Sequence, residues 1–261
     1  ECLTESESCN DLSLLNRVWR DEVRRLAGAG VKTVSELAVK SVPELEALVP
    51  NVNPSRLETM RDQAIAIHDH RHIIRADIEL PEASIELFFD IEADPLRDFI
   101  YLFGVYEVTD KGEQYYQFFA ETPEQEGAMW QEFITFIEGR IDAPIYHYGW
   151  YEQDVIRHFS AKFGISEIAR EALHRNMIDI LSVIRPAIIF PLYFYSLKDI
   201  ATYIGFNWRS KDASGANSVV WFEEWLKKKS PKLLKKIVEY NEDDVIATYK
   251  LQRWVREHAG L

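Results

Sequence analysis

The chain has 261 residues, of which 47% are apolar, so it is long enough for one sizeable core and a smaller unit. Its formal net charge of −13 argues against a protein that coats nucleic acid through bulk electrostatic attraction. No apolar run approaches the roughly 18–20 residues of a membrane span, and the first residues lack the basic start and apolar core of a signal peptide.

The first predicted unit covers residues 1–76 and is helical. Leucines and valines recur there at spacings compatible with helices, and no alternating strand pattern occurs. Gly28 and Gly30 indicate a tight turn between short helices, with Thr33 or Ser35 capping the helix that follows. Such a hairpin can present backbone N–H groups to a phosphate, although a plain glycine turn in a helical bundle explains the same residues.

The second predicted unit, residues 82–261, is an α/β domain. Apolar and polar residues alternate across 84–92, which is the period of a strand. The predicted elements, in chain order, are strands at 84–92, 100–106 and 115–120, a helix at 123–140, a strand at 144–148 and a helix at 151–163, followed by mostly helical sequence. This order predicts a mixed sheet with helices on its faces.

Acidic residues are concentrated at three places, which are the end of one predicted strand, the residues just after another, and a late helix. Asp90 and Glu92 are two apart on one strand, so their side chains leave the same face of the sheet and can bridge a pair of metal ions. Phe88 lies on the same face, so we do not expect this face of the sheet to be simply exposed to solvent. Glu152 opens a predicted helix, where the helix dipole by itself favours a carboxylate, and Asp154 is an alternative acid in the same turn.

The third acidic segment lies on a late helix. Tyr240 and Asp244 are four residues apart and therefore share a face, which we expect to point inward. Asp243 lies about 100° further round the helix and is predicted to point outward. A tyrosine one turn before an acid can orient a water that attacks a phosphorus atom.

Four acids gathered from three distant segments would repel one another unless cations held them together. Carboxylate oxygens are the ligands that Mg²⁺ and Mn²⁺ prefer, so the sequence predicts a metal-dependent phosphodiesterase. A run of lysines just before the third segment is either a solvated helix face or an edge that follows the phosphates of a nucleic acid. The lysines that we assign to nucleic-acid binding are Lys227, Lys228 and Lys232.

These acidic motifs resemble, in this order, those of the DEDD group of 3′–5′ exonucleases of the ribonuclease-H-like superfamily. Asp90-x-Glu92 resembles the first motif, and Tyr240-x-x-x-Asp244 resembles the third in the subgroup with a tyrosine there. The second motif usually reads His-Asn-x-x-Phe-Asp, and the segment 147–152 matches it position by position with glutamate as its last residue.

More narrowly, the chain resembles the C-terminal half of bacterial RecB-like nucleases over about residues 10–258. In that group the second motif often reads His-Tyr-x-x-Tyr-Glu, as it does here at 147–152. The segment 26–37 resembles the helix-hairpin-helix-like spacer of those proteins. The resemblance also implies an upstream nuclease domain of the same protein, in which case Cys2 and Cys9 would be the tail of an upstream cysteine cluster.

The resemblance implies that Asp90, Glu92, Glu152 and Asp244 hold two Mg²⁺ or Mn²⁺ ions, and that Tyr240 helps to prepare the attacking water. The implied activity is 3′–5′ exonuclease cleavage of DNA, or of RNA, from a 3′ end by a two-metal-ion mechanism. Aromatic residues beside the motifs offer surfaces on which a terminal base could stack, or they belong to the core. They are Phe88, Trp150 and Tyr151.

Two other functions fit the same residues. A structure-selective endonuclease could use the same fold, and it would differ by cutting closed circular single strands. A catalytically weakened ribonuclease-H-like module could instead dock nucleic acid or a partner nuclease, which the glutamate at 152 and the acidic net charge favour. With two cysteines and no signal peptide, we predict a cytoplasmic protein without membrane association.

Overall fold

The computed structural model describes residues 2–212 and 214–260, apart from the side chain of Cys2. The chain divides into two compact units. The first comprises residues 2–78 together with Ile184–Ile200, and the second comprises Glu79–Val183 and Ala201–Gly260. The sequence did not indicate that Ile184–Ile200 would group with the N-terminal helices, because this stretch was read as part of the second unit.

The first unit is helical, as predicted, with one small sheet. Its helices are α1 (Cys2–Cys9), α2 (Arg20–Gly28), α3 (Val34–Ala38), α4 (Val42–Leu48) and α5 (Pro54–Asp69), with a short 3-10 turn at Leu12–Leu14. Thr33, rather than Ser35, caps α3, because its hydroxyl accepts from the Glu36 N–H while the Glu36 carboxylate accepts from the Thr33 N–H. Gly30 adopts a φ of 89°, which explains the glycine in this turn.

A two-stranded antiparallel sheet closes the first unit. It pairs β1 (Ile73–Ile74) with β7 (Ile188–Ile189), which come from distant parts of the sequence. Strands of two residues leave no readable alternation, so the sequence predicted neither of them. Cys9 is exposed and its thiol is free. The side chain of Cys2 lies outside the described residues, so the upstream cysteine cluster stays a prediction.

The second unit contains the mixed sheet that the sequence predicted. Its strands lie in the order β4-β3-β2-β5-β6, and β2, β3 and β4 form an antiparallel meander while β5 and β6 run parallel to β2. The strands are β2 (Ile85–Asp94), β3 (Phe99–Thr109), β4 (Gly112–Phe119), β5 (Ile145–His147) and β6 (Met177–Asp179). β6 was not predicted, because three residues flanked by helices show no strand period.

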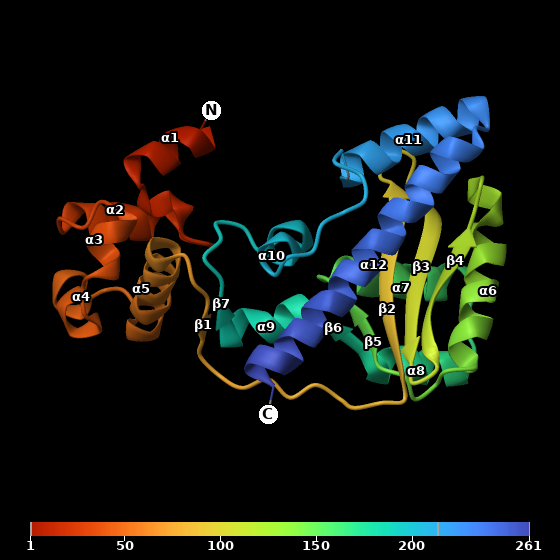
Figure 1. Cartoon of the computed structure of the whole chain (residues 1–261), viewed down its shortest axis with the longest axis horizontal. Coiled ribbons are helices and arrows are strands. Elements are labelled where there is room, and N and C mark those ends of the chain that lie inside the picture. Colours follow the sequence, from red (N-terminus) through yellow and green to blue (C-terminus); the bar gives the residue numbers. More distant parts are fainter. Residues whose placement is uncertain (1, 213, 261) are drawn as a thin grey trace. The chain divides into compact units, whose positions relative to one another are not determined.

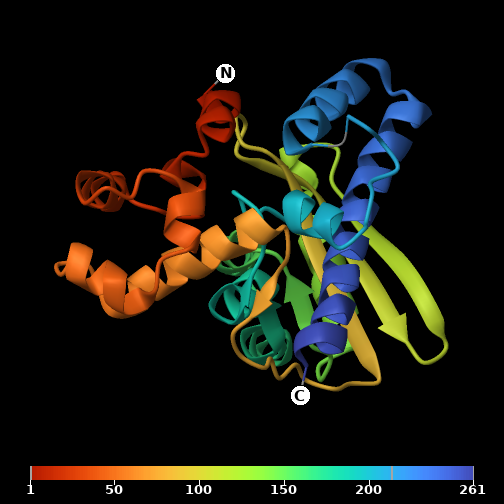
Figure 2. The ribbon, with the colours of Figure 1, turned by 60° about the vertical axis from the view of Figure 1, so that its left-hand side comes forward.

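Helices cover both faces of this sheet (Figures 1 and 2). The helices of the second unit are α6 (Glu126–Glu138), α7 (Tyr151–Phe163), α8 (Glu167–Asn176), α11 (Gly215–Lys228) and α12 (Pro231–Ala259). Two further helices, α9 (Ile180–Ala187) and α10 (Leu197–Tyr203), cross the division between the units. Phe89 and Phe103 pack against Phe133 of α6 on one face. The long helix α12 crosses the opposite face, the one that carries Asp90 and Glu92.

Two contacts, one near the start of β2 and one in its middle, fix the position of α12 along that strand. Gln252 donates a hydrogen bond to Glu86 (3.0 Å), and Asn241 donates one to Asp90 (2.8 Å). The buried Phe88 lies between the two acids on the same face. Because the later helix residue meets the earlier strand residue, α12 runs antiparallel to β2, and its middle turns lie over the acidic end of the strand.

Glu86 is a buried carboxylate that connects β2 to the last turns of α12. Its side chain is 4% exposed and accepts from Arg256 (2.6 Å), from Arg253 and from Gln252. Removing a carboxylate that is buried with several donors is strongly destabilising, because the guanidinium groups then lose their partner. Glu86 therefore holds α12 in its position over the strand.

We expect Glu86→Ala to lower the free energy of unfolding by about 3–5 kcal/mol, because it leaves the partly buried Arg253 and Arg256 without their carboxylate. Urea denaturation followed by near-ultraviolet circular dichroism measures the loss. Glu82→Ala is the matched control, since Glu82 is exposed, and it should change stability by less than about 0.5 kcal/mol. Equal effects of the two substitutions would contradict this role of Glu86.

Candidate active site

Three of the four predicted acids lie close together where α12 crosses β2. One carboxylate oxygen from each of Asp90, Glu92 and Asp244 lies within 4.8 Å of the others. Asp90 and Glu92 come from the end of β2, and Asp244 comes from the turn of α12 that crosses it. Glu92 and Asp244 are buried and Asp90 is partly buried, so the group is not an exposed acidic patch. Oxygen ligands at this spacing suit a divalent cation.

Neutral donors hold these carboxylates in place. Asn241 donates to Asp90 Oδ2 (2.8 Å), and the Trp208 indole donates to Asp244 Oδ1 (2.6 Å). On the third acid, the Tyr101 hydroxyl donates to Glu92 Oε2 (3.5 Å). Among the described residues, neither Asp90 nor Glu92 forms an ion pair. These donors therefore orient the carboxylates without neutralising their negative charge.

The uncompensated charge shifts the protonation of the group. Burial raises the pKa of Asp90 well above its usual range, and the charges of Asp244, Glu92 and Glu152 raise it further. Burial, followed by the charge of Asp244, raises the pKa of Glu92 to about 8. A bound cation would favour the ionised carboxylates. The raised pKa values therefore indicate a concentration of negative charge that suits metal binding.

Glu152, the predicted second-motif acid, lies at the start of α7 and is 4% exposed. It lies outside the group of three acids within 4.8 Å, yet it is near enough for its charge to raise the pKa of Asp90. Its Oε2 atom is buried, 3.5 Å from His147 Nδ1, and accepts no hydrogen bond from a described residue. Such an oxygen is costly to bury, so the arrangement fits a ligand that supplies positive charge.

Asp154, the alternative acid of this motif, does not join the cluster. It pairs with Arg157 on the outer surface of α7, and its side chain is 40% exposed. The two acids are two residues apart on a helix and so point in different directions. The structure therefore brings Glu152, and not Asp154, toward Asp90.

Tyr240 lies one helical turn before Asp244, and its hydroxyl bonds the Asp244 carboxylate. Burial raises the pKa of this phenol strongly, and the charges of Asp244, Glu92 and Asp90 raise it further. The hydroxyl is consequently protonated at neutral pH and acts as a hydrogen-bond donor. It is suited to orienting a water molecule rather than to removing its proton.

The prediction that Asp243 points outward is wrong. Asp243 is buried, and its carboxylate accepts from the backbone N–H (2.9 Å) and side-chain Nε (2.7 Å) of Arg209. The loop before α11 covers the face of α12 that simple helical periodicity would expose. Arg209 also pairs with Glu242 at 2.7 Å, so it neutralises Asp243 and Glu242, whereas Asp244 joins the acidic group.

The three aromatic residues proposed for base stacking differ in exposure. Phe88 is fully buried between the rings of Tyr146 and Tyr249, so it belongs to the core and cannot meet a base. Trp150 and Tyr151 are exposed at the start of α7, with ring centroids 6.5 Å apart. Of the three, Trp150 and Tyr151 are the ones that can offer a stacking surface beside Glu152.

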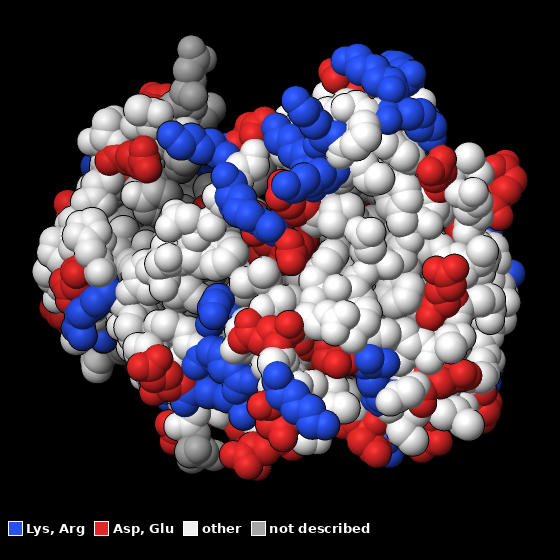
Figure 3. Space-filling view, turned by 45° about the vertical axis from the view of Figure 1, so that its right-hand side comes forward, with Lys and Arg blue, Asp and Glu red and all other residues white. Residues whose placement is uncertain are grey.

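The predicted lysines lie where α11 meets α12, and blue side chains gather at this end of the molecule in Figure 3. Lys228 is partly neutralised by Glu224 (2.8 Å), and Lys229 by Glu121 (2.8 Å). Lys227 and Lys232 are exposed and form no ion pair with a described residue. Their binding to nucleic acid stays a prediction, with part of the positive charge cancelled by neighbouring acids.

Sequence analysis missed the residues that support the acids. Asn241 and Tyr101 lie in segments that resemble those of the RecB-like group, but they were given no role, and Trp208 comes from a segment that was not singled out. Gly104 is paired with Asp90 in the sheet, and a Cβ atom there would lie 1.6 Å from Asn241 Oδ1. The glycine in the middle of β3 was the one visible signal, because strand interiors rarely favour glycine unless another group approaches closely.

We expect Gly104→Ala to lower stability by about 1–3 kcal/mol, because the new methyl group displaces Asn241 from Asp90. A double-mutant cycle with Asn241→Ala, measured by urea denaturation, tests this cause. The effect of Gly104→Ala should largely disappear when Asn241 is already truncated. A cost that is the same in both backgrounds would show that the glycine serves another purpose.

A family model described as the RNase H superfamily matches residues 87–256, about two thirds of the chain. No curated protein and no solved structure matches the chain. The matched range contains Asp90, Glu92, Glu152, Tyr240 and Asp244, and the mixed sheet with helices on both faces agrees with this fold. Superfamily membership indicates nuclease-type hydrolysis of nucleic acid. The chain belongs to the RNase H superfamily.

Proposed function

We propose that the second unit is a metal-dependent 3′–5′ exonuclease that hydrolyses phosphodiester bonds of DNA, with RNA as the other substrate to test. The observation that carries the proposal is the group of Asp90, Glu92 and Asp244, held within 4.8 Å by neutral donors. Tyr240 on the same helix face and the buried Glu152 complete the set that its sequence motifs associate with this activity.

The donor set fits hard divalent cations. All four side chains offer carboxylate oxygens, no thiolate lies among them, and the buried Glu152 Oε2 has no hydrogen-bond donor among the described residues. Asp90, Glu92, Glu152 and Asp244 would hold two Mg²⁺ or Mn²⁺ ions. When bound, such ions acidify the attacking water and neutralise charge on the phosphate and the leaving oxygen.

The remaining residues supply orientation. Tyr240 stays protonated and donates to Asp244, so its hydroxyl oxygen can accept from the attacking water and orient it. Asn241 and Trp208 keep two of the acids aimed at the same point. The exposed Trp150 and Tyr151 provide flat surfaces beside Glu152 for the last base of a strand.

We expect Asp90→Asn to reduce Mn²⁺-dependent release of nucleotides more than about 100-fold, because it removes a ligand charge while preserving the side-chain shape. A 3′-labelled single-stranded oligonucleotide, followed by denaturing electrophoresis, measures the release. Asp154→Asn is the matched control, since Asp154 lies on the outer surface of α7, and it should retain activity within about twofold.

The products separate the competing functions. Stepwise loss from the 3′ end, with closed circular single strands left intact, is the result expected of a 3′–5′ exonuclease. Cutting of the circle would indicate an endonuclease instead. Binding without hydrolysis under Mg²⁺ and Mn²⁺ would overturn the proposal in favour of a docking module.

The raised pKa values predict a pH dependence for the metal-free protein. An acid whose folded pKa lies above its unfolded value stabilises the fold below the unfolded pKa, and this contribution is lost as pH rises through the folded pKa. For Glu92 this window runs from about 4.5 to about 8. We expect the free energy of unfolding, measured in EDTA, to fall by a few kcal/mol between pH 5 and pH 8.5, on the order of 1 kcal/mol per pH unit.

Two comparisons identify the source of this fall. Glu92→Gln should flatten the pH profile and stabilise the metal-free protein at pH 8.5, since it removes one of the repelling charges. Saturating Mn²⁺ should restore stability at high pH, because a cation favours the ionised carboxylates. Asp90 accounts for a residual slope, but a profile as steep in Glu92→Gln as in the wild type would show that Glu92 does not titrate in this range.

A further inference from the structure

The first unit contains a pocket of about 500 Å³ whose lining carries four arginines and no carboxylate. The arginines are Arg17, Arg56, Arg75 and Arg185. They come from the turn before α2, from α5, from the residue after β1 and from the end of α9, all within the first unit. In a chain with a net charge of −13, such a concentration of positive charge requires an explanation.

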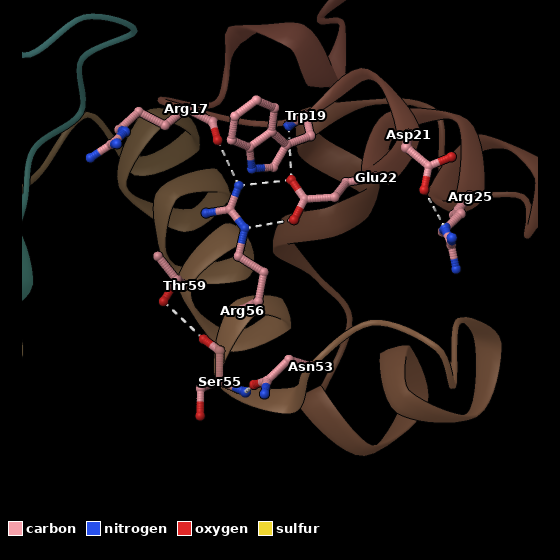
Figure 4. A network of polar contacts seen from close by, with 9 residues as sticks. All are labelled: Arg17, Trp19, Asp21, Glu22, Arg25, Asn53, Ser55, Arg56 and Thr59. Carbon is pink, nitrogen blue, oxygen red and sulfur yellow. Dashed lines mark hydrogen bonds and ion pairs between the residues drawn. The ribbon is translucent and has the colours of Figure 1, made fainter.

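Two of these arginines are structural. Arg56 forms a two-pronged pair with Glu22 at 2.7 and 2.8 Å and also donates to the Arg17 carbonyl at 2.8 Å. The Glu22 carboxylate accepts in turn from the Trp19 N–H at 2.8 Å (Figure 4). Arg75 is paired separately with Glu58 at 2.9 Å. These bonds fix the turn from 17 to 19, in which Arg17 adopts the left-handed conformation with φ 56°.

The side chains that this turn presents are not used by the fold. Trp19 is 71% exposed, and the Arg17 side chain is exposed and points away from the Glu22–Arg56 pair in Figure 4. Neither Arg17 nor the exposed Arg185 forms an ion pair with a described residue. The turn therefore holds an aromatic face and a guanidinium at the rim of a pocket with a second unpaired guanidinium.

A buried acceptor inside the pocket points to a ligand as well. Gln63 of α5 lines it, is 8% exposed, and its Oε1 atom accepts no hydrogen bond from a described residue. A buried carbonyl oxygen without a donor is costly, so such atoms usually have a partner in the functional state. A base N–H group would supply the missing donor.

We propose that this pocket binds one nucleotide unit of a single-stranded nucleic acid. The base stacks on Trp19 and donates to Gln63 Oε1, and the flanking phosphates meet Arg17 and Arg185. The exposed aromatic ring suits the flat face of a base, and the unpaired guanidiniums suit the negative charge of the phosphates. The buried acceptor suits an N–H group on the edge of the base. The choice of a strand over a free nucleotide rests on the proposed function, because the substrate of an exonuclease is a strand.

Fluorescence anisotropy of a labelled oligothymidylate, titrated with the full chain in EDTA, measures this binding without cleavage. We expect Trp19→Ala to weaken binding about tenfold, because stacking of a base on an aromatic ring is lost. Arg17→Gln and Arg185→Gln should each weaken binding and reduce the slope of log K against log salt by about 0.7, the change expected for one phosphate contact. Gln63→Met, which keeps the shape and removes the acceptor, should weaken it several-fold.

Arg71→Gln is the matched control, since Arg71 is an exposed arginine of the same unit that does not line the pocket. If Arg71→Gln weakens binding as much as Arg17→Gln does, or if Trp19→Ala binds like the wild type, the pocket proposal is overturned. Thymidine monophosphate that binds as tightly as the oligonucleotide, with the same dependence on Trp19, would overturn the strand in favour of a free nucleotide.

The two proposals fail separately. Hydrolysis that requires Asp90 while Trp19→Ala binds normally would reject the pocket and leave the exonuclease intact. Trp19-dependent binding without hydrolysis under Mn²⁺ would reject the exonuclease and leave the pocket as the binding site of a docking module.

Discussion

The position of α12 along β2 is the constraint on which the candidate site depends. Asp90 and Glu92 share a strand, so their separation is set locally, whereas Asp244 reaches them only if the helix crosses the strand at the right place. Glu86 and its donors hold one end of this crossing, and the bond between Asn241 and Asp90 holds the other. A shift of one helical turn, about 5.4 Å, would separate the acids altogether.

The electrostatics of the second unit divide its acids into two groups. Asp243 and Glu242 are paired with Arg209, and Glu86 is paired with arginines of α12, so these acids serve the fold. Asp90 and Glu92 are held by neutral donors instead, and their pKa values rise because their repulsion is not relieved. The repulsion between these carboxylates lowers the stability of the metal-free protein, and a bound cation would restore it, as expected of a functional site.

Among the described residues, no helix has the length and apolar character to span a membrane.

Positive charge is likewise not used uniformly. The lysines near the junction of α11 and α12 are exposed or partly exposed, yet Lys228, Lys229 and Lys236 each pair with a glutamate or aspartate, which weakens their attraction for phosphates. The four arginines that line the pocket are fewer. Arg56 and Arg75 are paired with glutamates, whereas Arg17 and Arg185 form no ion pair with a described residue and line the same pocket as the exposed Trp19. A contact to nucleic acid built this way depends on shape as well as on charge, which is consistent with a protein of strongly negative net charge.

The sequence by itself predicted the helical first region, the mixed sheet apart from β6, and the acids of the candidate site, because strand alternation and helical spacing are local properties of the sequence. It also favoured Glu152 over Asp154, which agrees with the burial of the one and the exposure of the other. Only the tertiary structure decided that Asp243 is buried, that Gly104 admits Asn241, and that Ile184–Ile200 joins the first unit. These features depend on which segment covers a given face, and no period in the sequence encodes a covering segment from a distant part of the chain.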